Sequence, residues 1–245
     1  IPYTEAMEKY GSDKPDLRID LLVQDATACM ADCGFGPFEG QTVKAIVCSG
    51  FEGTRKVIDK LCADVEVQSG NKAYWFRLDA NGEFVGGISK FLQERKEAVI
   101  AALDLKPGDF IGLTAGKKLT AQKTAGVLRK MLGAVCPAHM KTDCYEFCWI
   151  VDFPMYEIGE ESGELEFCHN PFSMPQGGMK ALEEQEPLNI LAYQYDLVCN
   201  GVELSSGAVR NHDPEIMVKA FNMVGLGEED VKAKLGGETI GVIFP

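Results

Sequence analysis

The chain has 245 residues, of which 46% are hydrophobic and 25% charged, and its formal net charge is −13. This composition is typical of a globular protein with one large domain or two ordinary ones. No apolar run approaches the roughly 20 residues of a membrane-spanning helix, and we expect no signal peptide because the N-terminus is polar. Because the chain does not begin with Met, we expect it to be a piece of a longer protein.

The first half of the chain predicts helices packed on a mainly antiparallel sheet. Residues 2–10 predict a short helix that Gly11 ends. Asn81-Gly82 is a strong hairpin signal between two apolar runs. The elements expected after the first turn are a strand at 42–50, a helix at 54–65, a hairpin at 73–88, a helix at 89–105, a strand at 106–116 and a helix at 118–133. This order favours an α+β unit over about 40–135.

The second half predicts further strands and two short helices. Residues 147–158 form an unusually apolar strand, and 183–204 is expected to hold a strand or a strand pair. Pro214 begins a helix that ends near Gly225, and a further helix is expected at 228–236. A change of composition near residue 140 indicates a domain boundary.

The charges and cysteines narrow the classes of function. Residues 141–245 carry 6 basic and 19 acidic side chains, which disfavours nucleic-acid contact there and favours a small ligand. The nine cysteines are scattered and odd in number, which indicates reduced thiols and a cytoplasmic protein. The pairs Cys29/Cys33 and Cys144/Cys148 have only weak metal-site spacing, and the three histidines make a zinc site improbable.

The stretch 200–212, NGVELSSGAVRNH, combines small residues with Glu203 and Arg210. Arginine suits two-pronged binding of a carboxylate or phosphate, and small residues allow close approach to the backbone. The stretch therefore fits a surface against which a small charged ligand lies. It equally fits a strand and turn with a surface ion pair.

Other acidic and imidazole groups stand near apolar strands. Asp152 must be paired, cation-bound or on a solvent-facing edge. Asp196 and Glu203 are either a Mg²⁺-holding carboxylate pair or two independent surface acids. His169 and His212 are further candidates, although a lone histidine is more often a hydrogen-bonded core residue.

One expected helix is basic, and its cations are candidates for phosphate contact or, more simply, a solvated face. They are Lys117, Lys118, Lys123, Arg129 and Lys130. The chain contains no Walker-type phosphate loop and no convincing GxGxxG motif.

Four motifs in order resemble bacterial aspartyl-tRNA synthetases. They are YGSDKPDLR (10–18), VDFPMYE (151–157), FCHNPFSMP (167–175) and YDLVCNGVELSSGAVRNH (195–212). Between them, GGISKFL (86–92) and KPGDFIGLTAGKK (106–118) resemble the GAD domain inserted into that family's catalytic core. The resemblance implies residues 1–30 as a core segment, 31–140 as a GAD-like α/β sandwich and 141–245 as the returning antiparallel-sheet core of a class II synthetase.

The resemblance also implies a reaction and residue roles. The family activates aspartate with ATP and Mg²⁺ to aspartyl-adenylate, then acylates tRNA, as a cytoplasmic enzyme that is usually a homodimer. By position, Arg210 resembles the arginine that grips the aspartate side chain, and His169 the histidine of a loop that closes on aspartate. Glu203 resembles the acid that binds ATP through Mg²⁺, and Asp196 a second metal-holding acid.

Some family features differ or are not found. Asn170 and the SSGA at 205–208 stand where the family usually has His and GGGS. The anticodon-binding barrel, the early class II motifs and the stretch before ETIGVIFP are not found, so we expect the isolated chain to be inactive. The alternative is a non-enzymatic tRNA- or protein-binding GAD module, as in tRNA-dependent amidotransferases. The flanking motifs disfavour that alternative, and the insert disfavours an asparagine enzyme.

Overall fold

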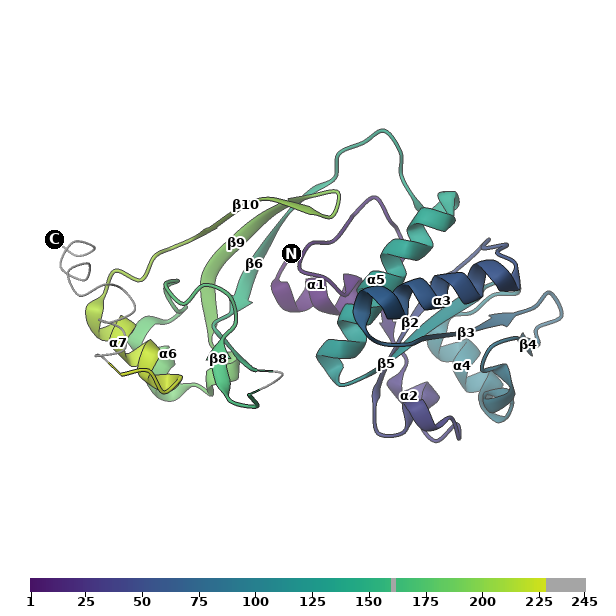
Figure 1. Cartoon of the computed structure of the whole chain (residues 1–245), viewed down its shortest axis with the longest axis horizontal. Helices are drawn as coiled ribbons and strands as arrows, with labels where there is room; N and C mark the ends of the chain where they lie inside the picture. Colours follow the sequence, from purple (N-terminus) through teal and green to yellow (C-terminus); the bar gives the residue numbers. More distant parts are fainter. Residues whose placement is uncertain (160–161, 228–245) are drawn as a thin grey trace. The chain divides into compact units, whose positions relative to one another are not determined.

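The computed structural model describes residues 1–159 and 162–227. The chain forms two compact units, whose elements are labelled in Figure 1. The larger unit comprises Glu5–Phe147 with Cys199–Val202. The smaller unit comprises Ile1–Thr4, Cys148–Val198 and the described residues from Glu203 onward.

The larger unit is built on a five-stranded sheet. In sheet order its strands are β1 (Val23–Asp25), β2 (Thr42–Cys48), β5 (Phe110–Gly116), β3 (Ala73–Leu78) and β4 (Phe84–Val85). Each neighbouring pair is antiparallel, and on β5 Gly112 lies opposite both Ile46 and Trp75. The mixture of helices with an antiparallel sheet confirms the α+β prediction.

Helices cover both faces of this sheet (Figure 1). On one face, α2 (Thr27–Met30) and α4 (Lys96–Leu103) pack on the strands, and on the other α3 (Arg55–Ser69) and α5 (Lys118–Val135) do so. Each face buries a continuous apolar cluster, and fully burying one Leu, Ile or Phe stabilises a fold by about 1.5–3 kcal/mol. The sheet is therefore the middle layer of the unit.

The helix predicted over 89–105 is partly wrong. The chain instead makes two 3-10 turns, Ser89–Phe91 and Gln93–Arg95, before α4 begins at Lys96. Helix α4 ends at Asp104, whose left-handed backbone lets its N–H bond the Ile100 carbonyl. The remaining short turns are Gly36–Phe38, Pro137–His139 and, in the smaller unit, Pro187–Asn189.

The predicted first helix is α1 (Tyr3–Tyr10), and two glycines bring the turn after it against α5. A Cβ on Gly11 would lie 2.3 Å from the Gln122 carbonyl oxygen, and a Cβ on Gly126 would lie 2.2 Å from the Gly11 carbonyl oxygen. Gly11 also has a positive φ of 66°, which disfavours other residues. The YGSDKP segment is thus in backbone-to-backbone contact with α5.

Arg129 of α5 holds the same segment from inside. Its side chain is 2% exposed and donates hydrogen bonds to the carbonyl oxygens of Leu21, Ile19 and Asp16, at 2.6, 2.6 and 3.1 Å. Its guanidinium also lies over the Tyr10 ring, 4.9 Å from the centroid. The expectation of a solvated basic face is therefore wrong for Arg129, which is a structural residue.

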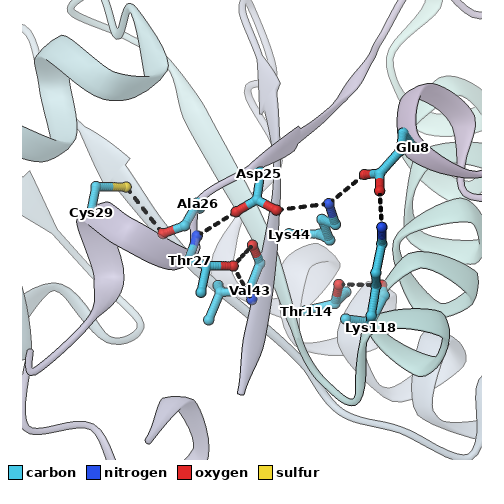
Figure 2. Close-up of polar contacts among 10 residues, drawn as sticks. Glu8, Asp25, Ala26, Thr27, Cys29, Val43, Lys44, Thr114 and Lys118 are labelled. Atoms are coloured by element: carbon cyan, nitrogen blue, oxygen red, sulfur yellow. Dashed lines mark hydrogen bonds and ion pairs between the residues drawn. The ribbon is translucent and has the colours of Figure 1, made fainter. Parts of the chain in front are cut away.

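Lys44 of β2 is a second buried cation, 1% exposed (Figure 2). Its Nζ donates to Glu8 at 2.7 Å and to Asp25 at 3.0 Å, and Asp25 is its cross-strand neighbour on β1. Burial alone would lower the pKa of Lys44, but the two carboxylates outweigh burial and raise it. Glu8 also pairs with Lys118 at 2.7 Å, so the acid lies between two cations.

The smaller unit contains a three-stranded sheet ordered β10 (Val202–Ala208), β9 (Leu191–Cys199) and β6 (Phe147–Pro154). A separate antiparallel pair joins β7 (Tyr156–Ile158) to β8 (Leu165–Phe167). The strand predicted at 147–158 is therefore broken at Met155. The strand pair predicted within 183–204 is confirmed, and its turn is Asn200-Gly201, both with positive φ.

Two helices complete this unit, α6 (Gly178–Glu184) and α7 (Pro214–Met223). The Asp213 carboxylate caps α7 by accepting from the N–H groups of Glu215 and Ile216, and Pro214 occupies the first turn as predicted. Buried Tyr156 donates its hydroxyl to the Ala220 carbonyl at 3.0 Å, which ties β7 to α7. The helix expected at 228–236 lies outside the described residues.

None of the helices in the two described stretches has the length and apolarity that crossing a bilayer requires. The larger unit is wider than the domain expected over 31–140, since it begins at Glu5 and includes the segment held by Arg129. Compact units and family domains are different divisions of a chain. The boundaries 1–30, 31–140 and 141–245 therefore stay predictions.

The Lys44 cluster generates a first prediction. The double substitution Glu8→Gln with Asp25→Asn leaves a buried ammonium without a counter-charge, so the free energy of unfolding falls by about 3 kcal/mol. Lys44→Met removes the charge at similar volume and changes that free energy by about 1 kcal/mol or less. Urea unfolding of the three proteins measures both effects. An equal loss of unfolding free energy in both variants would contradict this prediction, because it would mean that the ion pairs of Lys44 themselves stabilise the fold.

The glycine contact generates a second prediction. Gly126→Ala destabilises the chain by about 1–3 kcal/mol, although alanine favours a helix by about 1 kcal/mol. The matched control is Gly133→Ala in the same helix, where the three heavy atoms nearest to a new Cβ all belong to the Ile19 side chain, the closest at 2.7 Å. We expect a clearly smaller loss there in thermal unfolding. A stabilised Gly126→Ala protein would contradict the backbone contact.

Candidate functional site

Three segments of the smaller unit cross beside Arg210. The chain at 172–176 runs between the start of β9 and the residues that follow β10. Tyr193 N–H donates to the Met174 carbonyl at 2.9 Å, and Met174 N–H donates to the Val209 carbonyl at 2.8 Å. These bonds join the FCHNPFSMP segment to the VRNH segment.

Arg210 lies at the centre of this crossing. Its backbone forms an antiparallel bridge with Ser173, and the next residue, Asn211, donates its N–H to the Phe172 carbonyl at 2.8 Å. The arginine is exposed, and its guanidinium makes no ion pair with any residue that the structure describes. The backbone is therefore fixed while the charged group remains open to a ligand.

Two buried polar groups flank Arg210. Ser173 is 0% exposed and Asn211 is 2% exposed. Within the described stretches, Ser173 Oγ and Asn211 Nδ2 have no hydrogen-bond partner in the protein. Such groups are uncommon in folded proteins and fit a place that water or a ligand completes. Sequence analysis did not single out either residue.

His169 is exposed and lies against two aromatic rings. Its ring meets Phe153 edge-on with 4.9 Å between centroids, and Tyr3 edge-on at 5.9 Å. His169 precedes the Asn170–Ser173 turn, where the Asn170 side chain accepts from Phe172 N–H at 2.9 Å. Asn170 thus shapes the loop that connects His169 to the strand beside Arg210. His212 is exposed, and its Nδ1 lies 3.3 Å from the Arg210 carbonyl oxygen.

Asp152 has a partner that the sequence did not reveal. Gln176 donates its side-chain amide to Asp152 Oδ1 at 2.7 Å. Asp152 has a positive φ of 56°, which is rare for a residue within a strand. The acid is therefore hydrogen-bonded and half-buried within β6, and the interaction links β6 to the crossing segment.

Asp196 and Glu203 stand on neighbouring strands, β9 and β10. Asp196 is 4% exposed, whereas Glu203 is exposed to solvent. Carboxylate oxygens are ligands that Mg²⁺ prefers, so the chemistry of both residues fits this ion. Their unequal exposure means that an ion bound to Asp196 would lie well below the surface that Glu203 occupies.

Gly207, one of the small residues of β10, makes room for an aromatic ring. A Cβ on Gly207 would lie 2.5 Å from the Tyr195 ring. The ring of Tyr195 therefore fills the space that glycine leaves, and at this residue the strand does not present a bare floor. Ser205 and Ser206 are exposed and remain accessible.

The sheet carries an exposed aromatic face. Trp149 is 50% exposed, Tyr193 46% and Tyr195 40%. Tyr193 and Tyr195 share a face because they alternate along β9, and the Trp149 ring meets Tyr195 with 5.8 Å between centroids. Contiguous apolar surface of this kind marks a contact or ligand-binding surface.

The chain matches the family model for class II tRNA synthetases (D, K and N) over residues 1–237. It is 48% identical over 240 residues to an aspartate–tRNA ligase of Streptomyces coelicolor, covering 97% of this chain and 40% of the relative. It is 49% identical over 244 residues to an aspartate–tRNA(Asp/Asn) ligase of Acidiphilium cryptum, covering 97% and 41%.

The chain thus spans about 40% of the length of the curated relatives that it matches. The matched residues include the motif that precedes the larger unit's sheet in the sequence, the sheet itself, and the motifs that follow it. The chain belongs to the class II tRNA synthetases of the D, K and N group.

Proposed function

We propose that this chain is part of an aspartate–tRNA ligase that activates aspartate with ATP and transfers it to tRNA. The observation that carries the proposal is the exposed side chain of Arg210 on a backbone held by its neighbours, in a chain whose relatives are named as aspartate–tRNA ligases. Those names favour a ligase over a non-enzymatic GAD module. The free cysteines in the described residues agree with a reducing cytoplasm.

In the proposed reaction, Arg210 binds the side-chain carboxylate of aspartate. An oxygen of the α-carboxylate then attacks the α-phosphorus of ATP, the bond to the β-phosphate oxygen breaks, and pyrophosphate leaves. An always-charged, planar guanidinium distinguishes aspartate from asparagine because a neutral amide would leave it without a counter-charge. Ser173 and Asn211 would complete their hydrogen bonds through water or substrate at the same place.

His169 would close over bound aspartate. Its position against Phe153 and Tyr3 holds the imidazole at the start of the loop that leads to Ser173. A loop that excludes water strengthens the ionic contacts in a site. We assign His169 a binding role, because the resemblance places it in the loop that closes on aspartate.

Glu203 would bind ATP, and Asp196 would share a Mg²⁺ ion with it. The ion supplies positive charge that offsets the charge of the phosphates. Buried Asp196 and exposed Glu203, on neighbouring strands, would be the two carboxylates that hold the ion. We further propose that the rest of a longer, homodimeric enzyme covers the aromatic face formed by Trp149, Tyr193 and Tyr195.

Substitution of Arg210 tests the assignment of the site. In the full-length enzyme, Arg210→Lys keeps the charge but loses the two-pronged contact, so kcat/KM for aspartate falls by about 10²–10⁴-fold. The KM for ATP changes little, because the residue is assigned to aspartate. Steady-state aminoacylation at varied aspartate and varied ATP separates the two effects.

The control is Arg55→Lys on α3, an arginine whose side chain is 84% exposed and whose ion-pair partner among the described residues is Asp59 of its own helix. We expect both kinetic constants to stay at the wild-type values there. An Arg210→Lys enzyme with an unchanged kcat/KM for aspartate would remove Arg210 from the site.

A further inference from the structure

Two cysteines and a histidine that are distant in sequence meet in the larger unit. Cys48 is the last residue of β2, Cys136 follows the end of α5, and His139 ends the 3-10 turn Pro137–His139. One ligand atom from each of the three lies within 4.8 Å of the others. Within the described stretches this is the group of three metal-binding side chains that comes together, and neither C-x3-C pair belongs to such a group.

The histidine is already oriented. His139 Nδ1 lies 2.6 Å from a carboxylate oxygen of Asp20, and Nε2 lies 2.9 Å from the carbonyl oxygen of Ser49. Histidine ligands commonly donate one ring N–H to a carboxylate, which leaves the lone pair of the other nitrogen for a metal. Asp20 thus holds a proton on Nδ1, and Nε2, which faces the Ser49 carbonyl, is the nitrogen that can bind a metal once it has lost its own proton.

The two thiols are closely placed and shielded from water. Cys48 is 0% exposed and Cys136 is 3% exposed, and the Cys136 thiol points toward the Ser49 carbonyl at 3.9 Å. Burial, reinforced by the adjacent Cys136, raises the pKa of Cys48 well above its ordinary value. Burial therefore disfavours a charged Cys48 thiolate in the absence of a cation. Two thiolates and one divalent cation, however, form a neutral group that suits a buried place.

We propose that Cys48, Cys136 and His139 bind a thiophilic divalent cation such as Zn²⁺. On binding, each thiol releases its proton to solvent and forms a sulfur–metal bond. His139 also releases to solvent the Nε2 proton that it donates to the Ser49 carbonyl, keeps Nδ1–H toward Asp20, and forms the third bond through Nε2. Water fills the fourth position. Two sulfurs and one imidazole select zinc over Mg²⁺ or Ca²⁺, which prefer oxygen ligands.

The site would fasten the end of α5 to the end of β2. Both elements belong to the larger unit, and none of the three ligands is among the residues proposed for aspartate or ATP. Binding a cation to the folded state alone also raises the midpoint of thermal unfolding as the metal concentration rises. The inference therefore stands or falls separately from the ligase assignment.

The test is a cobalt(II) titration of the full 245-residue chain under reducing conditions, followed by absorption. We expect one Co²⁺ per chain, with the charge-transfer absorption of a cobalt–thiolate bond. Cys136→Ser removes most of that absorption. Asp20→Asn weakens the affinity by about 10–100-fold, because it removes the partner that orients His139. Zn²⁺ added afterwards displaces the cobalt.

The matched control is Cys62→Ser, a half-buried cysteine of α3 outside the cluster, which should bind cobalt as the wild type does. Circular dichroism checks that Cys136→Ser is folded. If Cys136→Ser does not fold, the Asp20→Asn protein still decides the test. The Asp20 side chain is 62% exposed, so its substitution should leave the fold intact. The absence of cobalt–thiolate absorption in the folded wild type would overturn the proposal. So would equal affinity in Asp20→Asn, or a Cys48–Cys136 disulfide that forms in place of metal binding.

Discussion

Arg129 carries its positive charge into the interior of the larger unit, where its guanidinium donates to the carbonyls of Asp16, Ile19 and Leu21. A buried cation is costly unless its hydrogen bonds are satisfied, so the chain at 16–21 must follow a path that brings these oxygens together. That path ends where β1 begins at Val23. Together with the Gly11 contact on Gly126, it fixes the segment before the sheet onto the helix that covers it.

In the smaller unit, a segment is held in place by backbone hydrogen bonds and not by a buried charge. Residues 172–176 lie between the start of β9 and the end of β10, and their hydrogen bonds hold Arg210 by its main chain. The contacts that hold Arg210 come from its backbone, so its exposed side chain is accessible to a ligand. The two arginines therefore have opposite environments: Arg129 is buried and bonded to its own chain, whereas Arg210 is exposed and is proposed to bind a charged substrate.

Local patterns in the sequence were sufficient for most elements, because β-branched runs, Asn-Gly turns and Pro214 act through near neighbours. The resemblance of four ordered motifs indicated the family, which the match over residues 1–237 confirms. Such local patterns could not predict contacts between residues that are distant in the sequence. The burial of Arg129, the filling of Gly207's space by Tyr195, and the meeting of Cys48 with Cys136 depend on packing between residues that are distant in sequence or on neighbouring strands. The roles proposed for His169, Asp196, Glu203 and Arg210 still rest on their positions in the motifs and on the geometry around Arg210.

The most direct measurement is aspartate-dependent exchange of pyrophosphate into ATP, run in parallel on this chain and on the full-length protein. The account predicts exchange by the full-length protein with aspartate but not with asparagine, and none by the isolated chain. No exchange by the full-length protein, or equal exchange with asparagine, would contradict the proposed substrate. Exchange by the isolated chain at the full-length rate would show that these 245 residues already hold a complete adenylation site.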